Sequence, residues 1–489
     1  MKIKILIVTC LIIVISLFGL IIINNKSIYV TKQMYFENGE IESAWDFKKN
    51  LKIGWNLGMS FSANINYPDI IKYKIIVNNE KDMKTSDLFE CDINNKFNAD
   101  MNFVKTIVLE FDIPYTYLDG VLYWEIENLS FNNKIVYYIK EYQSVVKDGK
   151  LEVSINTNNV IDIKDINIQI KINKFYEDNT HEKVNFYETF WCNIKTTKQL
   201  FKTLKNEGFN AIRISFDVYN HIDENDVIDD KWLSRLKEVV DWCIQLDMYC
   251  LVDIVETYGL YVDNLNEDKV NLFIYLWEQL ATFFQDYGGK LLFSPFNEIR
   301  NSKGNWDTNN VEELANMNHL YQIFVDTIRS TGGYNKERNL LLTTYAASFS
   351  NSILEKFMIP NDSVNNHLLV ECHNYQPVRF TFNEINLGST DFLTEWGNFK
   401  DKKEMKKIFQ SLNKFIKKTR LPLIIGEFGV VDRIASSERI EYLNHYIRNA
   451  RKYKIGLFIF DDAHDFAIID RKTCQFIDDK LVDAILSEV

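Results

Sequence analysis

The feature that most constrains this chain is the alternation of short apolar runs with amphipathic segments that fills residues 188–489. Apolar runs of strand length that alternate with segments of helical periodicity predict strand–helix units and a parallel sheet. With one more run near residue 52 there are eight, the strand number of a closed (β/α)8 barrel. The eight runs are residues 52–63, 210–216, 248–254, 290–299, 339–345, 367–373, 423–427 and 456–461.

Two of these runs end on a glutamate. Residues 290–299 read K-L-L-F-S-P-F-N-E-I, so Asn297 and Glu298 follow a buried strand, and residues 421–429 read L-P-L-I-I-G-E-F-G, so Glu427 ends another. Each acid by itself could be an ordinary surface carboxylate in a loop. In a barrel, however, the carboxyl ends of all strands open on one face. We therefore expect Glu298 and Glu427 to share one site.

Residues 64–187 differ from the rest of the chain. Their apolar runs alternate with period two, turns rich in Asn and Asp separate these runs, and helical periodicity is almost absent. The pattern predicts an all-β sandwich domain, inserted in the first strand-to-helix loop and therefore on the same face of the barrel as the two glutamates. Its Tyr117, Tyr123 and Trp124 either stack on a ligand or belong to its own core.

The first residues predict a membrane segment. Residues 5–23 contain no charged side chain and follow Lys2 and Lys4. The run is longer than the core of a usual signal peptide and reaches the roughly 20 residues that span a bilayer. No cleavage site of small residues follows it directly, so residues 1–26 are expected to be an uncleaved signal anchor in preference to a removed signal peptide, and residues 27–44 a tether. Either alternative predicts an extracellular protein, anchored at the cell surface or secreted.

Charge and cysteine pattern exclude several classes of protein. The net charge of −12 argues against nucleic acid as a partner, because binding a polyanion requires clustered Lys and Arg. The seven cysteines are scattered without C-x-x-C spacing, and the seven histidines form no H-E-x-x-H pair. The cysteines and histidines therefore define no zinc site. The activity that the motifs described next imply requires no metal or organic cofactor.

Six motifs carry a resemblance to a known family. They are G-W-N-L-G at 54–58, E-T-F-W-C-N at 188–193, G-F-N-A-I-R-I-S-F at 208–216, F-S-P-F-N-E at 293–298, H-N-Y at 373–375 and I-I-G-E-F-G at 424–429. Together and in this order they resemble glycoside hydrolase family 5, the cellulase family, over residues 45–63 and 188–489. The resemblance implies a TIM-barrel glycosidase, and residues 64–187 would be an inserted β-sandwich similar to a carbohydrate-binding module.

The resemblance also implies a mechanism. Glu298 would be the general acid/base and Glu427 the nucleophile of a retaining glycosidase. Such an enzyme needs a protonated acid at the leaving oxygen and an ionised carboxylate across the sugar ring, because the transition state resembles an oxocarbenium ion. The implied activity is that of an endo-β-1,4-glycanase on a polysaccharide, with β-glucan, xyloglucan and mannan all open as substrates.

Further residues are expected to surround the two acids. By the same resemblance, Asn297 would bind the 2-hydroxyl of the sugar at the cleavage point, and Arg213 would orient the nucleophile. His373 and Tyr375 would line the same subsite. The aromatic candidates for sugar platforms, each of which could belong to the core instead, are Trp55, Trp191 and Trp396.

The chain departs from the family at two places. The family usually has N-I-H-H after the third strand, whereas residues 253–256 read D-I-V-E, with Val255 and Glu256 in place of the histidine pair. Glu256 either binds sugar hydroxyls or is a plain loop acid. After the eighth strand, Phe460 stands where the family usually has a substrate-stacking Trp. The alternative function is therefore a surface glycan-binding protein with a degenerate barrel, although binding alone does not require both acids.

Overall fold

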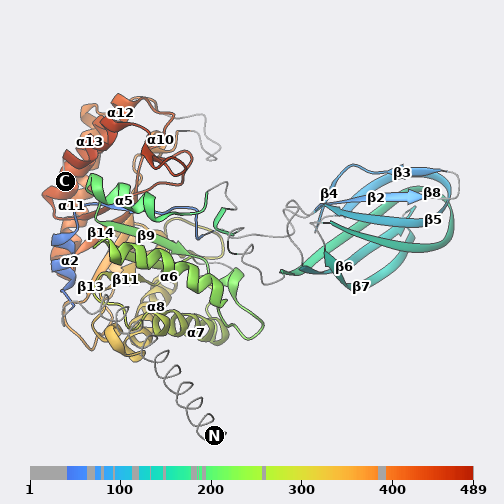
Figure 1. Ribbon diagram of the computed structural model, residues 1–489, viewed down its shortest axis with the longest axis horizontal. Helices are drawn as coiled ribbons and strands as arrows, with labels where there is room; N and C mark the ends of the chain where they lie inside the picture. Colours follow the sequence, from blue (N-terminus) through green and yellow to red (C-terminus); the bar gives the residue numbers. More distant parts are fainter. Residues whose placement is uncertain are drawn as a thin grey trace, which may run out of the picture. The chain divides into compact units, whose positions relative to one another are not determined.

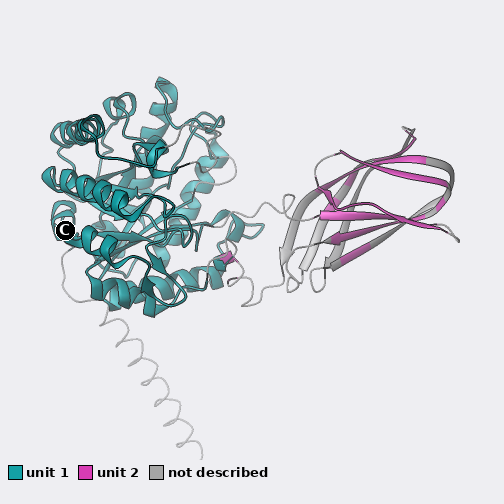
Figure 2. Cartoon of the chain, turned by 90° about the horizontal axis from the view of Figure 1, so that it is seen from above, with its two compact units in different colours: residues 1–63, 188–489 teal, residues 64–187 magenta. Residues whose placement is uncertain are grey.

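The computed structural model describes residues 41–62, 72–78, 82–91, 94–112, 120–132, 134–146, 150–177, 184, 187–189, 194–255, 260–383 and 393–487. The chain divides into two compact units, coloured separately in Figure 2. One unit comprises residues 1–63 and 188–489, and the other is Asn64–Tyr187. The first unit is discontinuous in sequence because the second is inserted within it.

Eight parallel strands form a closed barrel in the first unit (Figure 1). Each strand pairs with the next along the chain, and the first closes the ring by pairing with the last, Trp55 opposite Ile459. The predicted (β/α)8 barrel is thus confirmed, and each strand falls within one of the eight apolar runs except the seventh, which extends one residue past its run to Phe428. The strands are β1 (Gly54–Asn56), β9 (Ala211–Phe216), β10 (Tyr249–Ile254), β11 (Leu291–Ser294), β12 (Leu340–Thr343), β13 (Leu368–His373), β14 (Leu423–Phe428) and β15 (Gly456–Ile459).

Helices between the strands lie around the outside of the barrel (Figure 1). Their ends follow local sequence signals. The side chain of Thr197 caps the first turn of α5, which ends at Gly208 with φ 130°, a backbone conformation that favours glycine. Asn398 and Asp401 form a capping box at the start of α11. The longer helices are α5 (Lys198–Glu207), α6 (Asp230–Gln245), α7 (Glu267–Phe283), α8 (Val311–Ser330), α11 (Phe399–Thr419), α12 (Ser436–Lys452) and α13 (Asp479–Ser487), and the shorter ones are α9 (Asn351–Lys356) and α10 (Val378–Thr381).

A short helix before the first strand covers the amino-terminal end of the barrel. Helix α2 (Ala44–Asn50) contributes Phe47 to a buried apolar cluster with residues at the beginnings of the strands. The cluster comprises Ala44, Phe47, Leu51, Ala211, Tyr249, Leu251, Leu292, Leu341, Leu369, Ile424 and Phe458. Because apolar side chains fill this end, the polar side chains inside the barrel gather toward its carboxyl end.

The inserted unit is all-β, but its strands do not separate into the two sheets of a sandwich. The described strands form one antiparallel sheet in the order β3-β2-β5-β8-β6-β7, with β4 beside β2. The buried ring of Phe111 lies 4.9 Å from that of Trp124, between strands that are not neighbours in the sheet. Trp124 is therefore a core residue of this unit, whereas Tyr117 and the Tyr123 side chain lie outside the described residues. The strands are β2 (Lys72–Asn78), β3 (Met83–Thr85), β4 (Phe89–Glu90), β5 (Asn94–Asp112), β6 (Gly120–Phe131), β7 (Lys134–Val146) and β8 (Lys150–Glu177).

The predicted signal anchor at residues 1–26, most of the tether at 27–44 and the apolar run at 5–23 lie outside the described residues. Among the helices that the structure does describe, none combines the length and the apolar character needed to cross a membrane.

The closure of the barrel generates a testable expectation. Gly54 of β1 faces Phe458 of β15 so closely that an added Cβ would overlap the phenyl ring. Gly54→Ala should therefore lower the stability of the barrel by about 1–3 kcal/mol, the usual effect of overpacking. Differential scanning calorimetry of the whole chain would measure this as a lower transition temperature. At Gly289, by contrast, a Cβ would lie 3.1 Å from one methyl group of Ile41, so Gly289→Ala should cost less; equal losses for both variants would contradict this account.

Candidate active site

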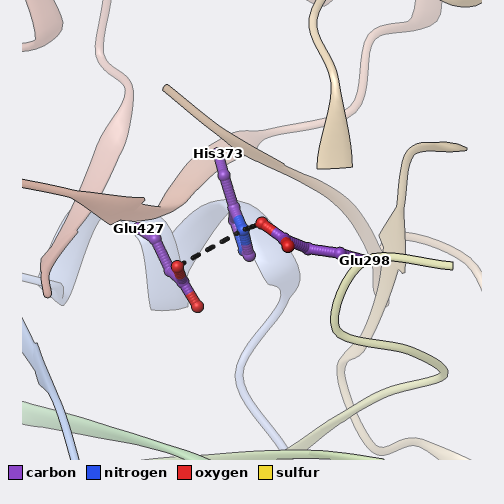
Figure 3. Close-up of side chains that lie close together, drawn as sticks. All are labelled: Glu298, His373 and Glu427. Carbon is purple, nitrogen blue, oxygen red and sulfur yellow. Dashed lines mark hydrogen bonds and ion pairs between the residues drawn. The ribbon is translucent and has the colours of Figure 1, made fainter. Parts of the chain in front are cut away.

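Three side chains from neighbouring parts of the barrel point toward one another at its carboxyl end (Figure 3). Glu298 lies in the loop that follows β11, His373 is the last residue of β13, and Glu427 lies near the end of β14. One ligand atom from each of the three lies within 4.8 Å of the others. The structure therefore brings together the two acids that the sequence placed on separate strand ends.

His373 connects the two acids to the interior of the barrel. Its Nδ1 lies 2.8 Å from Oε1 of Glu298 and 3.6 Å from Oε2 of Glu427. On the other side of the ring, Nε2 lies 3.3 Å from Nη2 of Arg213 and 3.6 Å from Oε1 of Glu371. The imidazole thus has carboxylates on both sides, and its side chain is only 4% exposed.

Arg213 of β9 holds the site from beneath. Its guanidinium is almost completely buried and donates through Nη1 to Oε1 of Glu427 at 2.8 Å and through Nη2 to Oδ1 of Asn297 at 2.9 Å. Its Nε donates to Oε1 of Glu371 at 2.8 Å, and Nη2 lies 3.2 Å from Oδ2 of Asp253. A planar guanidinium fixes its acceptors in one plane. Arg213 therefore sets the positions of Glu427 and Asn297 relative to the two buried acids, Glu371 and Asp253.

A backbone irregularity places Glu427. The pairing of β13 with β14 runs from Cys372 opposite Ile425 directly to His373 opposite Glu427, so Gly426 is the extra residue of a bulge. A Cβ at Gly426 would overlap the carboxylate of Glu371, which explains why glycine stands before the acid. The bulge turns the Glu427 side chain toward His373.

Tyr375 provides a second hydrogen bond to Glu427. Its hydroxyl donates to Oε2 at 2.8 Å, whereas Arg213 donates to Oε1. Burial and the carboxylate of Glu427 raise the pKa of Tyr375 well above its ordinary value, so the hydroxyl remains a donor. Its ring lies 6.1 Å from that of Phe460, which forms part of the aromatic wall beside Tyr375 and is partly exposed.

The buried charges shift one another's protonation. Burial acts to lower the pKa of His373, but Glu427, Glu298 and Glu371 outweigh this effect and raise the pKa to about 10. Burial acts to raise the pKa of Glu371, but Arg213 and His373 outweigh it and lower the pKa to about 2. Burial, helped by Glu371 and opposed by Arg213, raises the pKa of Asp253 to about 7. Near neutral pH, His373 is therefore a cation, Glu371 is an anion and Asp253 is close to half-protonated.

Two predicted sugar platforms are buried. The Trp55 side chain is inaccessible to solvent, and the guanidinium of Arg471 lies 5.1 Å from its ring centroid. Trp396 is 6% exposed and packs edge-on against Tyr442 at 5.3 Å. Both therefore belong to the core, and their assignment as sugar platforms was wrong. The two remaining candidates that the sequence suggested, Trp191 and Glu256, lie outside the described residues.

Buried polar residues beneath the site were missed from the sequence. Asn56 donates to the backbone oxygen of Gly426 at 2.9 Å and accepts from Arg213, while Asp253 and Glu371 contact the same guanidinium. A signal was available for one of them, because Glu371 precedes His373 by two residues in a strand and therefore lies on the same face.

An exposed tryptophan near Glu298 was also missed. Trp306 lies in the same loop after β11 and is 57% exposed, with the guanidinium of Arg300 4.2 Å from its ring centroid. The loop is tied down beside it, because the Tyr345 hydroxyl donates to the backbone oxygen of Asn305 at 2.9 Å. A single exposed apolar side chain is ordinary on a protein surface, so Trp306 is a candidate contact only because it shares its loop with Glu298.

The set of Glu298, His373 and Glu427 could also ligate a metal ion. Ligation through the His373 imidazole requires the neutral ring. The carboxylates that raise the pKa of His373 to about 10 keep the ring protonated and so oppose metal binding. The site fits a pair of carboxyl groups that differ in solvent exposure better than it fits a metal centre. Chemistry by a pair of acids needs no metal.

The electrostatics of the site predict the titration of His373. Its imidazole should remain protonated at pH 8, and the stability that this charge contributes should be present below pH 6.5 and be lost as the pH rises through about 10. Imidazole nitrogen shifts in NMR spectra would measure this. His367 serves as an internal control, because burial and Arg329 lower its pKa from 6.5. A His373 resonance that titrates together with His367 would contradict the assigned charge.

Comparison with known proteins agrees with the fold. The family model described as Cellulase (glycosyl hydrolase family 5) matches residues 175–463. Endoglucanase A of Ruminococcus albus is 32% identical over 324 residues, which cover 63% of this chain and 87% of that protein. Endoglucanase B of Neocallimastix patriciarum is 31% identical over 311 residues, 61% of this chain. The chain spans 64%, 37% and 59% of the lengths of three such curated relatives.

Solved structures give the same result. A family 5 lichenase from Caldicellulosiruptor sp. F32, in complex with cellotetraose, superposes with a TM-score of 0.59 at 30% identity, covering 64% of this chain and 88% of that one. A broad-specificity endoglucanase from Ruminococcus champanellensis with bound cellotriose gives 0.58 at 30% identity, covering 62% and 89%. With a family model that matches more than half of its length and an eight-stranded parallel barrel, this chain belongs to glycosyl hydrolase family 5, the cellulase family.

Proposed function

We propose that this protein is an endo-β-1,4-glucanase that hydrolyses polysaccharide by a retaining double displacement. The observation that carries the proposal is the pair of acids Glu298 and Glu427, which offer oxygen atoms within 4.8 Å of each other. Retaining glycosidases hold their two carboxyl groups about 5–5.5 Å apart, whereas inverting ones need about 6.5–9.5 Å to admit a water molecule. The short separation supports attack by a carboxylate over attack by water.

Glu427 is the proposed nucleophile. Arg213 donates to one of its oxygens and Tyr375 to the other, so its carboxylate is held in a fixed orientation and its exposed fraction is small. Such positioning lowers the barrier, because the attacking oxygen does not have to be ordered during the reaction. Attack on the anomeric carbon would give a glycosyl ester on Glu427 while the glycosidic oxygen leaves.

Glu298 is the proposed general acid and base. It is the more exposed of the two acids, with 18% of its side chain accessible, as a group that meets the leaving saccharide and later a water molecule must be. It would protonate the leaving oxygen in the first step and take a proton from water in the second. Asn297, whose side chain Arg213 orients, would bind the 2-hydroxyl of the same sugar.

Similarity to characterised relatives supports β-glucan as the substrate. The solved structures carry cellotetraose and cellotriose, both β-glucan fragments, at 30% identity. A xyloglucan-specific endo-β-1,4-glucanase of Bacteroides ovatus is also similar, at 28% identity over 59% of this chain. Xyloglucan therefore stands as the second candidate. The hydrogen bonds of Arg213 and Tyr375 to Glu427 give no support to a barrel that only binds glycan.

Trp306 is the proposed platform for the sugar on the leaving-group side. It shares its loop with Glu298, and its indole is exposed while those of Trp55 and Trp396 are buried. Sugar rings stack on aromatic faces through their apolar C–H surfaces, which an indole in water offers at low entropic cost because the loop is already anchored.

The two acids should be individually essential. Glu298→Gln and Glu427→Gln should each lower kcat on β-glucan by about 10²–10⁴-fold, because each removes one required proton transfer or bond-forming group. Release of reducing sugar would measure the rates, and circular dichroism would show that the variants are folded. Glu441→Gln is the matched control and should keep the rate, because Glu441 is a half-exposed residue of α12. Nearly full activity in either acid variant would refute the assignment.

Stereochemistry tests the double displacement separately. Retention predicts that the product formed first is the β-anomer, which proton NMR can detect before mutarotation. Early formation of the α-anomer would show inversion, although the protein would still be a glucanase.

Trp306→Ala should weaken binding of long substrates. We expect KM for cellohexaose to rise about tenfold and kcat/KM for a small aryl cellobioside to change little, because only the longer substrate reaches beyond the cleavage point. Trp45→Ala is the matched control, since Trp45 is a part-exposed tryptophan of α2 at the opposite end of the barrel. A Trp306 variant indistinguishable from the Trp45 variant would rule out the platform.

A further inference from the structure

Glu371 is a buried acid that takes no part in the proposed bond cleavage. It precedes His373 by two residues in β13 and is inaccessible to solvent. Its Oε1 accepts from Nε of Arg213 at 2.8 Å, and its Oε2 accepts from the hydroxyls of Ser294 at 2.9 Å and Thr343 at 3.1 Å. An ionised group this deep in a barrel is costly unless it is paired, and Arg213 supplies that pairing.

We propose that Glu371 is a positioning residue of this active site, whose buried negative charge keeps His373 protonated against Glu298 and thereby sets the upper pH limit of hydrolysis. The proposal rests on the proposed function, since it assigns Glu371 a role in the reaction that Glu298 and Glu427 perform. Glu371 does not touch the substrate in this scheme. It acts through Arg213, which it holds by a hydrogen bond, and through His373, whose Nε2 lies 3.6 Å from its Oε1.

The surroundings of Glu371 leave its carboxylate little room to move away from Arg213 and His373. The hydroxyls of Ser294 and Thr343 fix one oxygen of the carboxylate, so the other must face Arg213 and His373. The bulge at Gly426 brings the backbone of β14 against the same carboxylate, and any larger residue there would overlap it. The carboxylate therefore cannot move away from His373 without disturbing the strand that carries Glu427.

In weakly acidic solution, where Asp253 is mostly uncharged, the charges around His373 balance only if Glu371 is present. Before the reaction, Glu298 must carry a proton and Glu427 must be ionised. The two cations Arg213 and His373 are then matched by two anions, Glu427 and Glu371. Replacing Glu371 by an uncharged group would leave a net positive charge in a site that solvent barely reaches. Such a site would release the proton of His373 more easily.

Other titratable groups also face this cluster. Glu298 approaches His373 from the loop after β11, Glu427 from β14 and Arg213 from β9. Asp253 of β10 contacts Arg213 from below, and its pKa of about 7 leaves it mostly uncharged in weakly acidic solution. Burial raises the pKa of Asp253, so this acid is only partly ionised near neutral pH. Glu371, whose pKa is lowered to about 2, stays ionised throughout that range.

The test is Glu371→Gln, which keeps the shape and one acceptor oxygen but removes the charge. An opposite charge at this distance shifts a pKa by about 1–3 units, so the alkaline limb of kcat/KM against pH should move at least about one unit toward acid. The imidazole resonances of His373, assigned by their loss in His373→Gln, should show a pKa lower by a similar amount. The NMR measurement requires no catalysis, so a wild-type protein without hydrolytic activity would refute the proposed function and still leave this proposal tested.

Glu188→Gln is the matched control. Glu188 is an equally buried acid paired with an arginine, Arg235, at 2.8 Å, but neither residue contacts Arg213 or His373 in the described structure. It should lower the unfolding temperature and leave both the pH profile and the His373 titration unchanged. The proposal is overturned if Glu371→Gln lowers activity by the same factor at every pH with the His373 pKa unmoved, or if Glu188→Gln shifts the limb equally.

Discussion

The whole site depends on the burial of one guanidinium. Arg213 lies almost without solvent contact at the centre of the barrel and reaches acceptors on five other strands or their following loops. A buried cation must find anions and oriented dipoles, because its loss of hydration is otherwise not offset. The first role of the buried acids in the barrel is therefore to neutralise the charge of Arg213. Glu427, His373 and Asn297 lie at the edge of that network where the proposed substrate site is.

The sequence predicted those features that depend on local pattern and on the symmetry of a barrel. Alternating apolar runs specify strands and helices, and parallel strands share one carboxyl end, so Glu298 and Glu427 could be brought together without coordinates. Exposure could not be predicted in the same way. Whether Trp55 or Trp396 meets water depends on Arg471 and Tyr442, which are distant in sequence and cover or flank them only after folding. The spacing of Glu371 and His373 puts both on one face of their strand, but the partner of Glu371, Arg213, lies far away in sequence and is not indicated by the pattern.

The inserted unit shows a second limit of pattern. Period-two alternation identifies strands and which face of each is buried, but it does not say which strand pairs with which. In this unit β8 continues over 28 residues and pairs with β5 on one side and β6 on the other. Because β8 is so long, it joins into one sheet strands that the sequence pattern shows only as separate short runs. Boundaries are easier to predict than pairing, because a change of period marks them directly.

The position of the insertion has a consequence for how the barrel is assembled. Strand β1 leaves the ribosome first, yet its partners in the ring are β9 and β15, and the last of these lies near the other end of the chain. The entropic cost of closing a longer loop grows only logarithmically, so an insertion of this size adds little to it. Contacts inside the inserted sheet are nearer in sequence than the pairing of β1 with β15 and can form sooner. The pairing of β1 with β15 therefore spans almost the whole described barrel in sequence and closes the ring that the insertion interrupts.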